Sequence, residues 1–210
     1  REYAPQLWLN DSRGGWSAAS EALPAELALS AGAVAAGDFD RDGRLDLFLG
    51  ARVLPGSYPR APRSALLLNR GGKFEDAADK IAPGLAEAGM VTAALASDVD
   101  DDGWLDLLVA YEWGGVRYWR NRDGNGFDDM SEVSGFAAAG TGWWTSLTSA
   151  DFNGDGKLDY VAGNVGLNTL YRASKDEPAL LFAGKFSGAA GVTLVEAYYE
   201  NGKLYPRQTR

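Results

Sequence analysis

The sequence predicts an all-β protein built of β-propeller blades, each blade a four-stranded antiparallel sheet. The chain is repetitive: LWLN, LLLN and RYWRN end at Asn10, Asn69 and Asn121, at intervals of 59 and 52 residues. Such a period is typical of propellers and solenoids. Twenty-seven glycines and 11% aromatic residues favour turn-rich β structure. No long stretch shows the 3.6-residue period of an amphipathic helix.

Each repeat contains the same short segments in the same order. Strands rich in small residues are expected at GAVAAGDF, TAALASDV and SLTSADF. Apolar strands follow at LDLFLGA, LDLLVAY and LDYVAGN, and further strands at SALLLNR and VRYWRNR, with glycine turns at GGKF and GNGF. The repeats divide residues 1–210 into units at about 7–65, 66–117, 118–169 and 170–210, the last of them truncated and degenerate.

One segment, residues 74–89, could be read as helical. Pro83 and Gly84 interrupt it, and proline in a helix interior removes a hydrogen bond and clashes with the preceding turn. We therefore expect a loop there with at most a short helical turn.

Composition excludes several kinds of chemistry. The net charge of −9 disfavours nucleic acid as a partner, and no apolar run is long enough to cross a membrane. The chain has neither histidine nor cysteine. Without them it offers no ordinary zinc, copper or haem site, and no Ser–His–Asp or Cys–His nucleophile.

Three acidic stretches lie between the strands rich in small residues and the apolar strands that follow them: DFDRDGRLDLFLG (38–50), DVDDDGWLDLLVA (98–110) and DFNGDGKLDYVAG (151–163). Side-chain oxygens recur at positions 1, 3, 5 and 9, with glycine at position 6 for a sharp turn, and the carbonyl of position 7 can add a ligand. Oxygen ligands without nitrogen or sulfur select calcium or magnesium, and a cage of several carboxylates suits calcium. Metal-free acidic turns are the alternative, although carboxylates so close together would repel one another.

The EF-hand loop begins in the same way but needs a bidentate glutamate at position 12 and flanking helices. Position 12 is Leu49, Val109 or Ala162 here. None of these side chains binds a metal, so an EF-hand is excluded.

The pattern D-h-D-x-D-G-x-x-D, with h apolar, followed by an apolar strand, resembles the calcium loops of FG-GAP/VCBS repeats, the units of integrin α-subunit propellers. LLLNRGGKF and RYWRNRDGNGF are also similar to the LYLNDGxGxF element of that family. The resemblance implies about seven blades in a ring and a metal loop between the first two strands of a blade. The three intact loops of this chain predict three calcium ions, one in each loop. The implied ligands, with position 7 binding through its carbonyl, are Asp38, Asp40, Asp42, Arg44 and Asp46; Asp98, Asp100, Asp102, Trp104 and Asp106; and Asp151, Asn153, Asp155, Lys157 and Asp159.

The fourth unit departs from the pattern at KFSGAAGVT (185–193). Lys185, Ser187, Ala189 and Thr193 stand at the four ligand positions, and Ala190 stands at the glycine position. An ammonium group at position 1 opposes a cation, so we expect this loop to bind none. The following LVEAYYENGKLYP is expected to form a hairpin with ENGK as its turn.

These observations favour a non-catalytic extracellular, cell-surface or periplasmic module that binds calcium and presents loops to a protein or glycan ligand. A polysaccharide-acting enzyme domain and a structural subunit of a larger surface assembly, completed by other blades or subunits, are the alternatives. Trp143 and Trp144 could form a sugar platform but are more simply read as packing between blades, and Trp113 is the better surface contact. Glu112 and Glu196 have no spacing that supports an acid–base pair. The excursion at 52–64 is either a plain surface loop or a binding loop.

Overall fold

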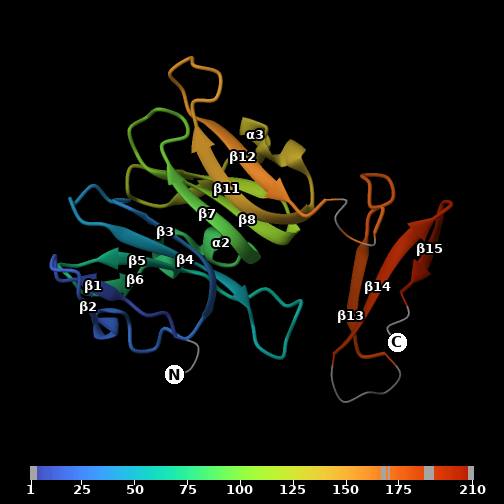
Figure 1. Cartoon of the computed structure of the whole chain (residues 1–210), viewed down its shortest axis with the longest axis horizontal. Coiled ribbons are helices and arrows are strands. Elements are labelled where there is room, and N and C mark those ends of the chain that lie inside the picture. The colour runs from blue at the N-terminus through green and yellow to red at the C-terminus, as the bar shows by residue number, and fades with distance from the viewer. Residues whose placement is uncertain (1–3, 167–168, 170, 187–191, 208–210) are drawn as a thin grey trace. The chain divides into compact units, whose positions relative to one another are not determined.

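A computed structural model of the whole chain describes residues 4–166, 169, 171–186 and 192–207 (Figure 1). The chain divides into two compact units, Arg1–Asn164 and Val165–Arg210. Each unit is described by itself.

The first unit consists mainly of antiparallel strands with a few short helical turns. Its elements are β1 (Trp8–Asn10), β2 (Trp16–Ala18), η1 (Ser20–Ala22), β3 (Ser30–Gly37), β4 (Asp46–Val53), β5 (Ala65–Asn69), β6 (Phe74–Asp76), α1 (Ala78–Ile81), α2 (Pro83–Ala86), β7 (Met90–Ser97), β8 (Asp106–Gly114), β9 (Val116–Asn121), β10 (Phe127–Asp129), α3 (Ser131–Ser134), η2 (Phe136–Ala139), β11 (Gly142–Ala150) and β12 (Asp159–Asn164).

The prediction of an all-β chain with antiparallel sheets is confirmed. One four-stranded sheet has the order β3-β4-β5-β6, and a second has the order β10-β9-β8-β11-β12, with β7 also paired to β8. The first sheet spans residues 30–76 and therefore crosses the boundary between the first two sequence units, which lies at 65/66. The sequence units start from the segment that ends at Asn10, whereas the sheet begins later, with β3. Each acidic stretch connects two paired strands: β3 to β4, β7 to β8, and β11 to β12 (Figure 1).

The core lies between the first two sheets because β4, β5 and β8 are apolar along most of their length. Phe48, Leu66 and Leu107 are almost completely buried there. Gly50 lies so close to Val91 that a Cβ atom at this position would collide with the valine side chain. Glycine therefore allows the two sheets to approach, and dense packing of this kind is what gives a core its stability.

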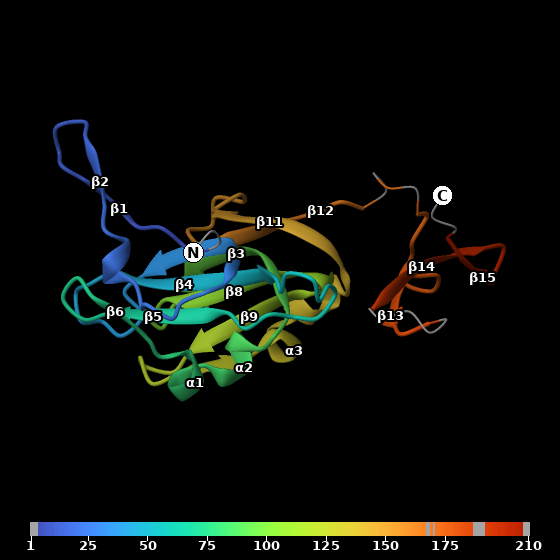
Figure 2. The ribbon, with the colours of Figure 1, turned by 90° about the horizontal axis from the view of Figure 1, so that it is seen from below.

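The segment 74–89 differs from the expectation of a loop with at most one turn. It forms β6 and two four-residue helices, α1 and α2, which with α3 lie along one side of the sheets (Figure 2). Pro83 is in the first turn of α2 rather than only ending a helix. Proline is tolerated there because the first N–H groups of a helix have no partner within it.

The second unit contains a three-stranded sheet, β13 (Leu180–Gly184), β14 (Thr193–Glu200) and β15 (Lys203–Pro206), in the order β13-β14-β15. Glu200 pairs with Lys203, so the expected ENGK hairpin is present. Asn201 and Gly202 have φ angles of +51° and +73°. Two positive φ angles are typical of the type I′ turn, which matches the twist of paired strands.

Candidate functional site

The three acidic loops share one local structure. In the first loop, a carboxylate oxygen of Asp38 accepts the N–H of Asp42 at 3.0 Å, and the other accepts the N–H of Gly43 at 2.9 Å. The second and third loops repeat both bonds from Asp98 and Asp151. The position-6 glycines are Gly43, Gly103 and Gly156, with φ angles of +84°, +87° and +85°. Such values strain any residue with a Cβ, which explains why glycine recurs at this position.

These turns bring carboxylates together. Carboxylate oxygens of Asp38, Asp40 and Asp42 lie within 4.8 Å of one another, as do those of the second-loop residues Asp98, Asp100 and Asp106. Oδ1 of Asp40 is buried and has no hydrogen-bond partner among the residues that the structure describes. A buried carboxylate oxygen without a partner is costly, and a bound cation would satisfy it. The oxygen-only donor set and this oxygen fit a hard divalent ion.

The third loop holds its side chains by hydrogen bonds of its own. Nδ2 of Asn153 donates to Oδ2 of Asp155 at 3.1 Å. Hydrogen bonds from backbone N–H groups lower the pKa of both Asp151 and Asp155. This loop is exposed from Asp151 to Leu158, and the carbonyl ligands expected at Arg44, Trp104 and Lys157 stay predictions.

The position-9 aspartates have a structural role besides any metal. Asp46 is fully buried; its Oδ2 accepts the N–H of Phe39 at 3.0 Å and its Oδ1 that of Asn69 at 2.8 Å. Burial raises the pKa of Asp46, the two backbone hydrogen bonds oppose that rise, and the nearby charges of Asp40 and Asp42 add to it. The carboxylate therefore ties the start of the loop to β5.

Asp106 does the same in the second loop. It accepts the N–H groups of Val99 at 2.9 Å and Asn121 at 2.7 Å, and the hydroxyl of Tyr118 at 3.1 Å. Burial is again the main cause of its raised pKa.

The asparagines that mark the repeat hold these loops, a role that the sequence patterns did not reveal. Nδ2 of Asn69 donates to the Leu45 carbonyl at 3.1 Å, and its Oδ1 accepts the N–H of Gly72 at 2.7 Å. Asn121 repeats this arrangement with Leu105 and Gly124. Their recurrence next to a glycine turn was the available signal.

Arginines enter the first two loops. Arg70 pairs with Asp40 at 2.8 Å and lies 3.4 Å from Asp42, which also pairs with Arg44. Arg120 pairs with Asp100 at 2.5 Å and with Asp102 at 2.9 Å. These pairs raise the pKa of both Arg70 and Arg120, and they were not anticipated from the sequence.

The fourth hairpin keeps the spacing of the others. Gly184 pairs with Thr193, as Gly37 pairs with Asp46 in the first hairpin. Lys185 is exposed at position 1. Ser187, Ala189 and Ala190 lie outside the described residues.

A polar cluster lies at the opposite ends of β4 and β8 from the acidic loops. Arg52 forms an ion pair with Glu112, and the Tyr58 hydroxyl donates to Oε1 of Glu112 at 2.7 Å. Nε1 of Trp113 donates to the Tyr58 oxygen at 2.6 Å, and the Trp113 ring contacts Trp143 with centroids 5.3 Å apart. Glu112 is thus held by a cation and a hydroxyl, as expected of a structural group.

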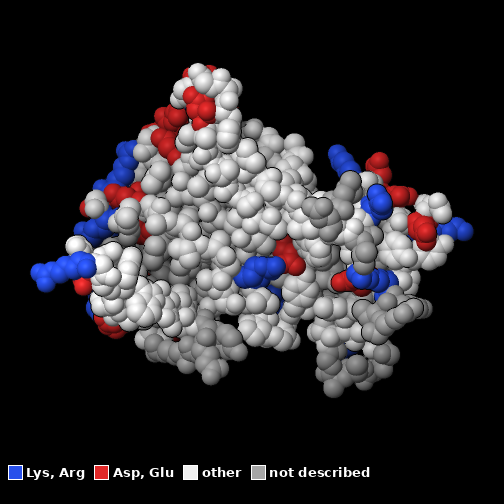
Figure 3. All heavy atoms as spheres, in the orientation of Figure 1, with Lys and Arg blue, Asp and Glu red and all other residues white. Residues whose placement is uncertain are grey.

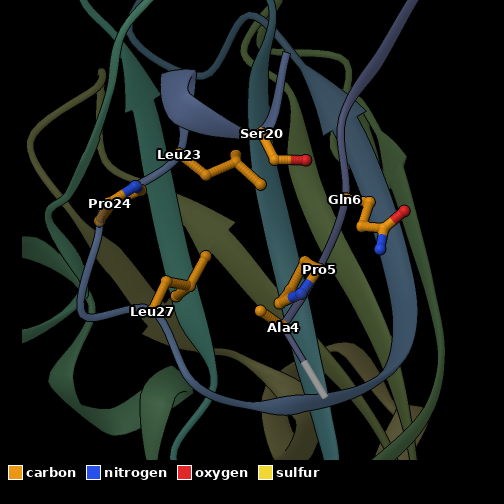
Figure 4. A pocket seen from close by; sticks show the side chains of 7 residues that line it. All are labelled: Ala4, Pro5, Gln6, Ser20, Leu23, Pro24 and Leu27. Atoms are coloured by element: carbon orange, nitrogen blue, oxygen red, sulfur yellow. The ribbon is translucent and has the colours of Figure 1, made fainter. Parts of the chain in front are cut away.

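Neither Glu196 nor the pocket in Figure 4 gives an acid–base site. Glu196, in the second unit, contacts Tyr171 and pairs with Arg207 at 3.1 Å. Figure 4 shows a pocket bordered by η1, by the residues that follow η1, and by the chain just before β1. None of the residues that line it is ionisable: Ala4, Pro5, Gln6, Ser20, Leu23, Pro24 and Leu27.

Fold and loops together define a class of protein: antiparallel sheets in which acidic turns join paired strands. A family model for the FG-GAP-like repeat matches residues 1–49 and 98–162, more than half of the chain. The chain belongs to the FG-GAP-like repeat family. No curated protein matched it. Among the described residues, no helix is long and apolar enough to span a membrane.

Proposed function

We propose that this chain is a calcium-binding module of propeller type, with one ion in each of the three acidic loops. Family membership supports blades that belong to a ring. The observation that carries the calcium proposal is that carboxylate oxygens of Asp38, Asp40 and Asp42 lie within 4.8 Å of one another, while Oδ1 of Asp40 is buried without a hydrogen-bond partner among the described residues.

Calcium would stabilise the folded loops of this module. Each loop joins two strands of one sheet. An ion held by positions 1, 3 and 5 would cross-link the turn, in addition to the hydrogen bonds that the position-1 aspartate accepts. Binding to the folded loop alone stabilises the fold by mass action. Stiffened blades would present their outer loops to a protein or glycan ligand, which is a binding or scaffold role without catalysis.

The location that fits this role is outside the cytosol or in the periplasm. Extracellular calcium modules bind at about 10⁻⁴–10⁻³ M, which matches the calcium concentrations there. The arrangement of Glu112 with Arg52 and Tyr58 favours a structural role over the alternative of a polysaccharide-acting enzyme.

Isothermal titration of the whole chain with calcium tests the proposal. We expect three ions per chain, with Asp42→Ala, Asp102→Ala and Asp155→Ala each removing one. Asp176→Asn, an exposed acid outside the loops, serves as the control and should leave three. Absence of calcium heat in the parent chain, together with absence of anomalous scattering at every loop of a calcium-soaked crystal, would refute the proposal.

A further inference from the structure

Two arginines lie where they oppose a cation in the first and second loops. Arg70 follows β5 and Arg120 belongs to β9, so each comes from the third strand of the sheet whose loop it enters. Each contacts the position-3 and position-5 aspartates of that loop. Three of these four aspartates, Asp40, Asp42 and Asp100, belong to the carboxylate clusters of their loops.

The arginine in each loop contacts carboxylates that are expected to bind the metal. Arg70 contacts Oδ2 of Asp40 and Oδ2 of Asp42, and Arg120 contacts Oδ2 of Asp100 and Oδ2 of Asp102. A guanidinium donates through a planar fork to such oxygens. A divalent ion bound by the same carboxylates would face this positive charge at a few ångströms, where repulsion is strong even near a protein surface.

The third loop lacks this feature in the part of the chain that the structure describes. Among the described residues, no lysine or arginine forms an ion pair with Asp151, Asp155 or Asp159, although the carboxylates of both other loops form several. Figure 3 shows the difference on one face. Red atoms stand without blue neighbours at the tip of the loop between β11 and β12, whereas blue atoms lie beside red ones along the edge with the other two loops.

We infer that Arg70 and Arg120 are affinity-setting residues of the first and second calcium loops: each neutralises its carboxylates in the calcium-free chain and must give them up when the ion binds. This inference rests on the proposed calcium binding. Both residues lie outside the metal-loop pattern. Their role would be to weaken calcium binding, so that their loops fill only at a higher calcium concentration.

The second loop allows a selective test. In a chain with Asp42→Ala and Asp155→Ala, only the second loop keeps all its ligands, and calcium titration then reports a single site. Trp104 at position 7 of that loop can transfer excitation energy to a terbium ion bound in place of calcium. Terbium luminescence excited through tryptophan therefore gives a second readout. We expect Arg120→Gln in this background to tighten calcium binding by about tenfold, because a nearby like charge is removed.

Arg122 provides a matched control. It is two residues further along and pairs with Asp128 at 3.0 Å, outside the loop. Arg122→Gln removes the same charge from the chain and should leave the affinity unchanged. Arg70→Gln, tested with only the first loop intact, should tighten that site while Arg120→Gln has no effect on it. Circular dichroism checks that each variant is folded.

The outcomes separate the two proposals. If no loop takes up calcium in the parent or in any arginine variant, the proposed function itself fails. If calcium binds but Arg120→Gln and Arg70→Gln leave the affinities of their loops unchanged, the inference about the arginines is overturned. Equal tightening by Arg122→Gln would also overturn it, because the effect would then come from net charge alone.

Discussion

The side-chain amide of Asn121 donates to the backbone carbonyl of Phe39, 82 residues earlier in the chain, at 2.9 Å. The same Nδ2 group donates to the carbonyl of Leu105 at 3.0 Å. One buried asparagine thus connects the acidic loop of the first sheet to that of the second. Asn69 makes only the equivalent bonds within its own sheet.

Asn121→Ala should therefore cost more stability than Asn69→Ala. Removing Asn121 leaves two carbonyls without their partner, which we expect to lower the free energy of unfolding by about 2–3 kcal/mol. Asn69 is partly exposed and its partners can bond to water, so its loss should cost about 1 kcal/mol or less. Urea denaturation in the presence of a chelator measures both. Equal losses would show that the link between the two sheets contributes nothing.

Position 2 of the loops offers a second matched pair. Phe39 is 2% exposed and packs edge-on against Phe127 with ring centroids 5.8 Å apart, whereas Phe152 at the same position of the third loop is 59% exposed. Phe39→Ala should lower the free energy of unfolding by about 3–5 kcal/mol through the cavity it creates. Phe152→Ala should change it by about 0.5 kcal/mol or less. A large loss at Phe152 would mean that another surface covers this side chain in solution.

Asp46 and Asp42 should respond differently to calcium. Asp46→Ala removes a buried carboxylate and leaves two backbone N–H groups unpaired, so we expect a loss of about 3 kcal/mol even in a chelator. Asp42→Ala should cost about 1 kcal/mol in the chelator, because the Asp42 carboxylate accepts the N–H of Arg44. Its main effect should be on the stabilisation that calcium adds. Thermal melts of both variants, with calcium and with chelator, test this. A loss at Asp46 that appears only with calcium would contradict the structural role of its carboxylate.

Calcium itself should raise the melting temperature of the whole chain. With dissociation constants of about 10⁻⁴–10⁻³ M, 10 mM calcium contributes roughly 1.4–2.7 kcal/mol for each filled loop. Magnesium at the same concentration should give a smaller shift, because it prefers few carboxylates and keeps its waters. Differential scanning calorimetry compares the two ions. Equal shifts would argue for a general charge effect instead of specific sites.

The fourth loop should stay without an ion. Calcium stoichiometry should be three, and Ser187→Ala or Thr193→Ala should leave it at three. Lys185 places a positive charge at position 1, and repulsion of a divalent ion at about 4 Å amounts to several kcal/mol at an effective dielectric near 20. A stoichiometry of four that falls to three in either variant would contradict this reading.

The parts of the site that sequence predicts well are local. The bonds from Asp38 to the N–H groups of Asp42 and Gly43 span four and five residues, so spacing alone implies the turn. The strands on either side follow from apolar runs and glycine turns. The ENGK hairpin is likewise contained within four residues.

The parts that sequence does not predict depend on which strands pair. Arg120 reaches Asp102 only because β9 lies beside β8, and Asn121 reaches Phe39 only because the two sheets pack together. Nothing in the pattern of the acidic stretches marks either residue. The helices around Pro83 are also hard to predict, because proline is typical both of the end of a helix and of its first turn, where it lies in α2.

The constant length of the four hairpins has an evolutionary consequence. In each hairpin, the last residue of the first strand pairs with a residue nine positions later in the sequence, on the second strand. The four pairs are Gly37 and Asp46, Ser97 and Asp106, Ala150 and Asp159, and Gly184 and Thr193. The fourth keeps this length without the aspartates. Ligands can therefore be lost, or restored, by point substitution after a repeat is duplicated, with no insertion or deletion and no change of strand register. Selection can adjust the number of ions that such a chain carries independently of its architecture.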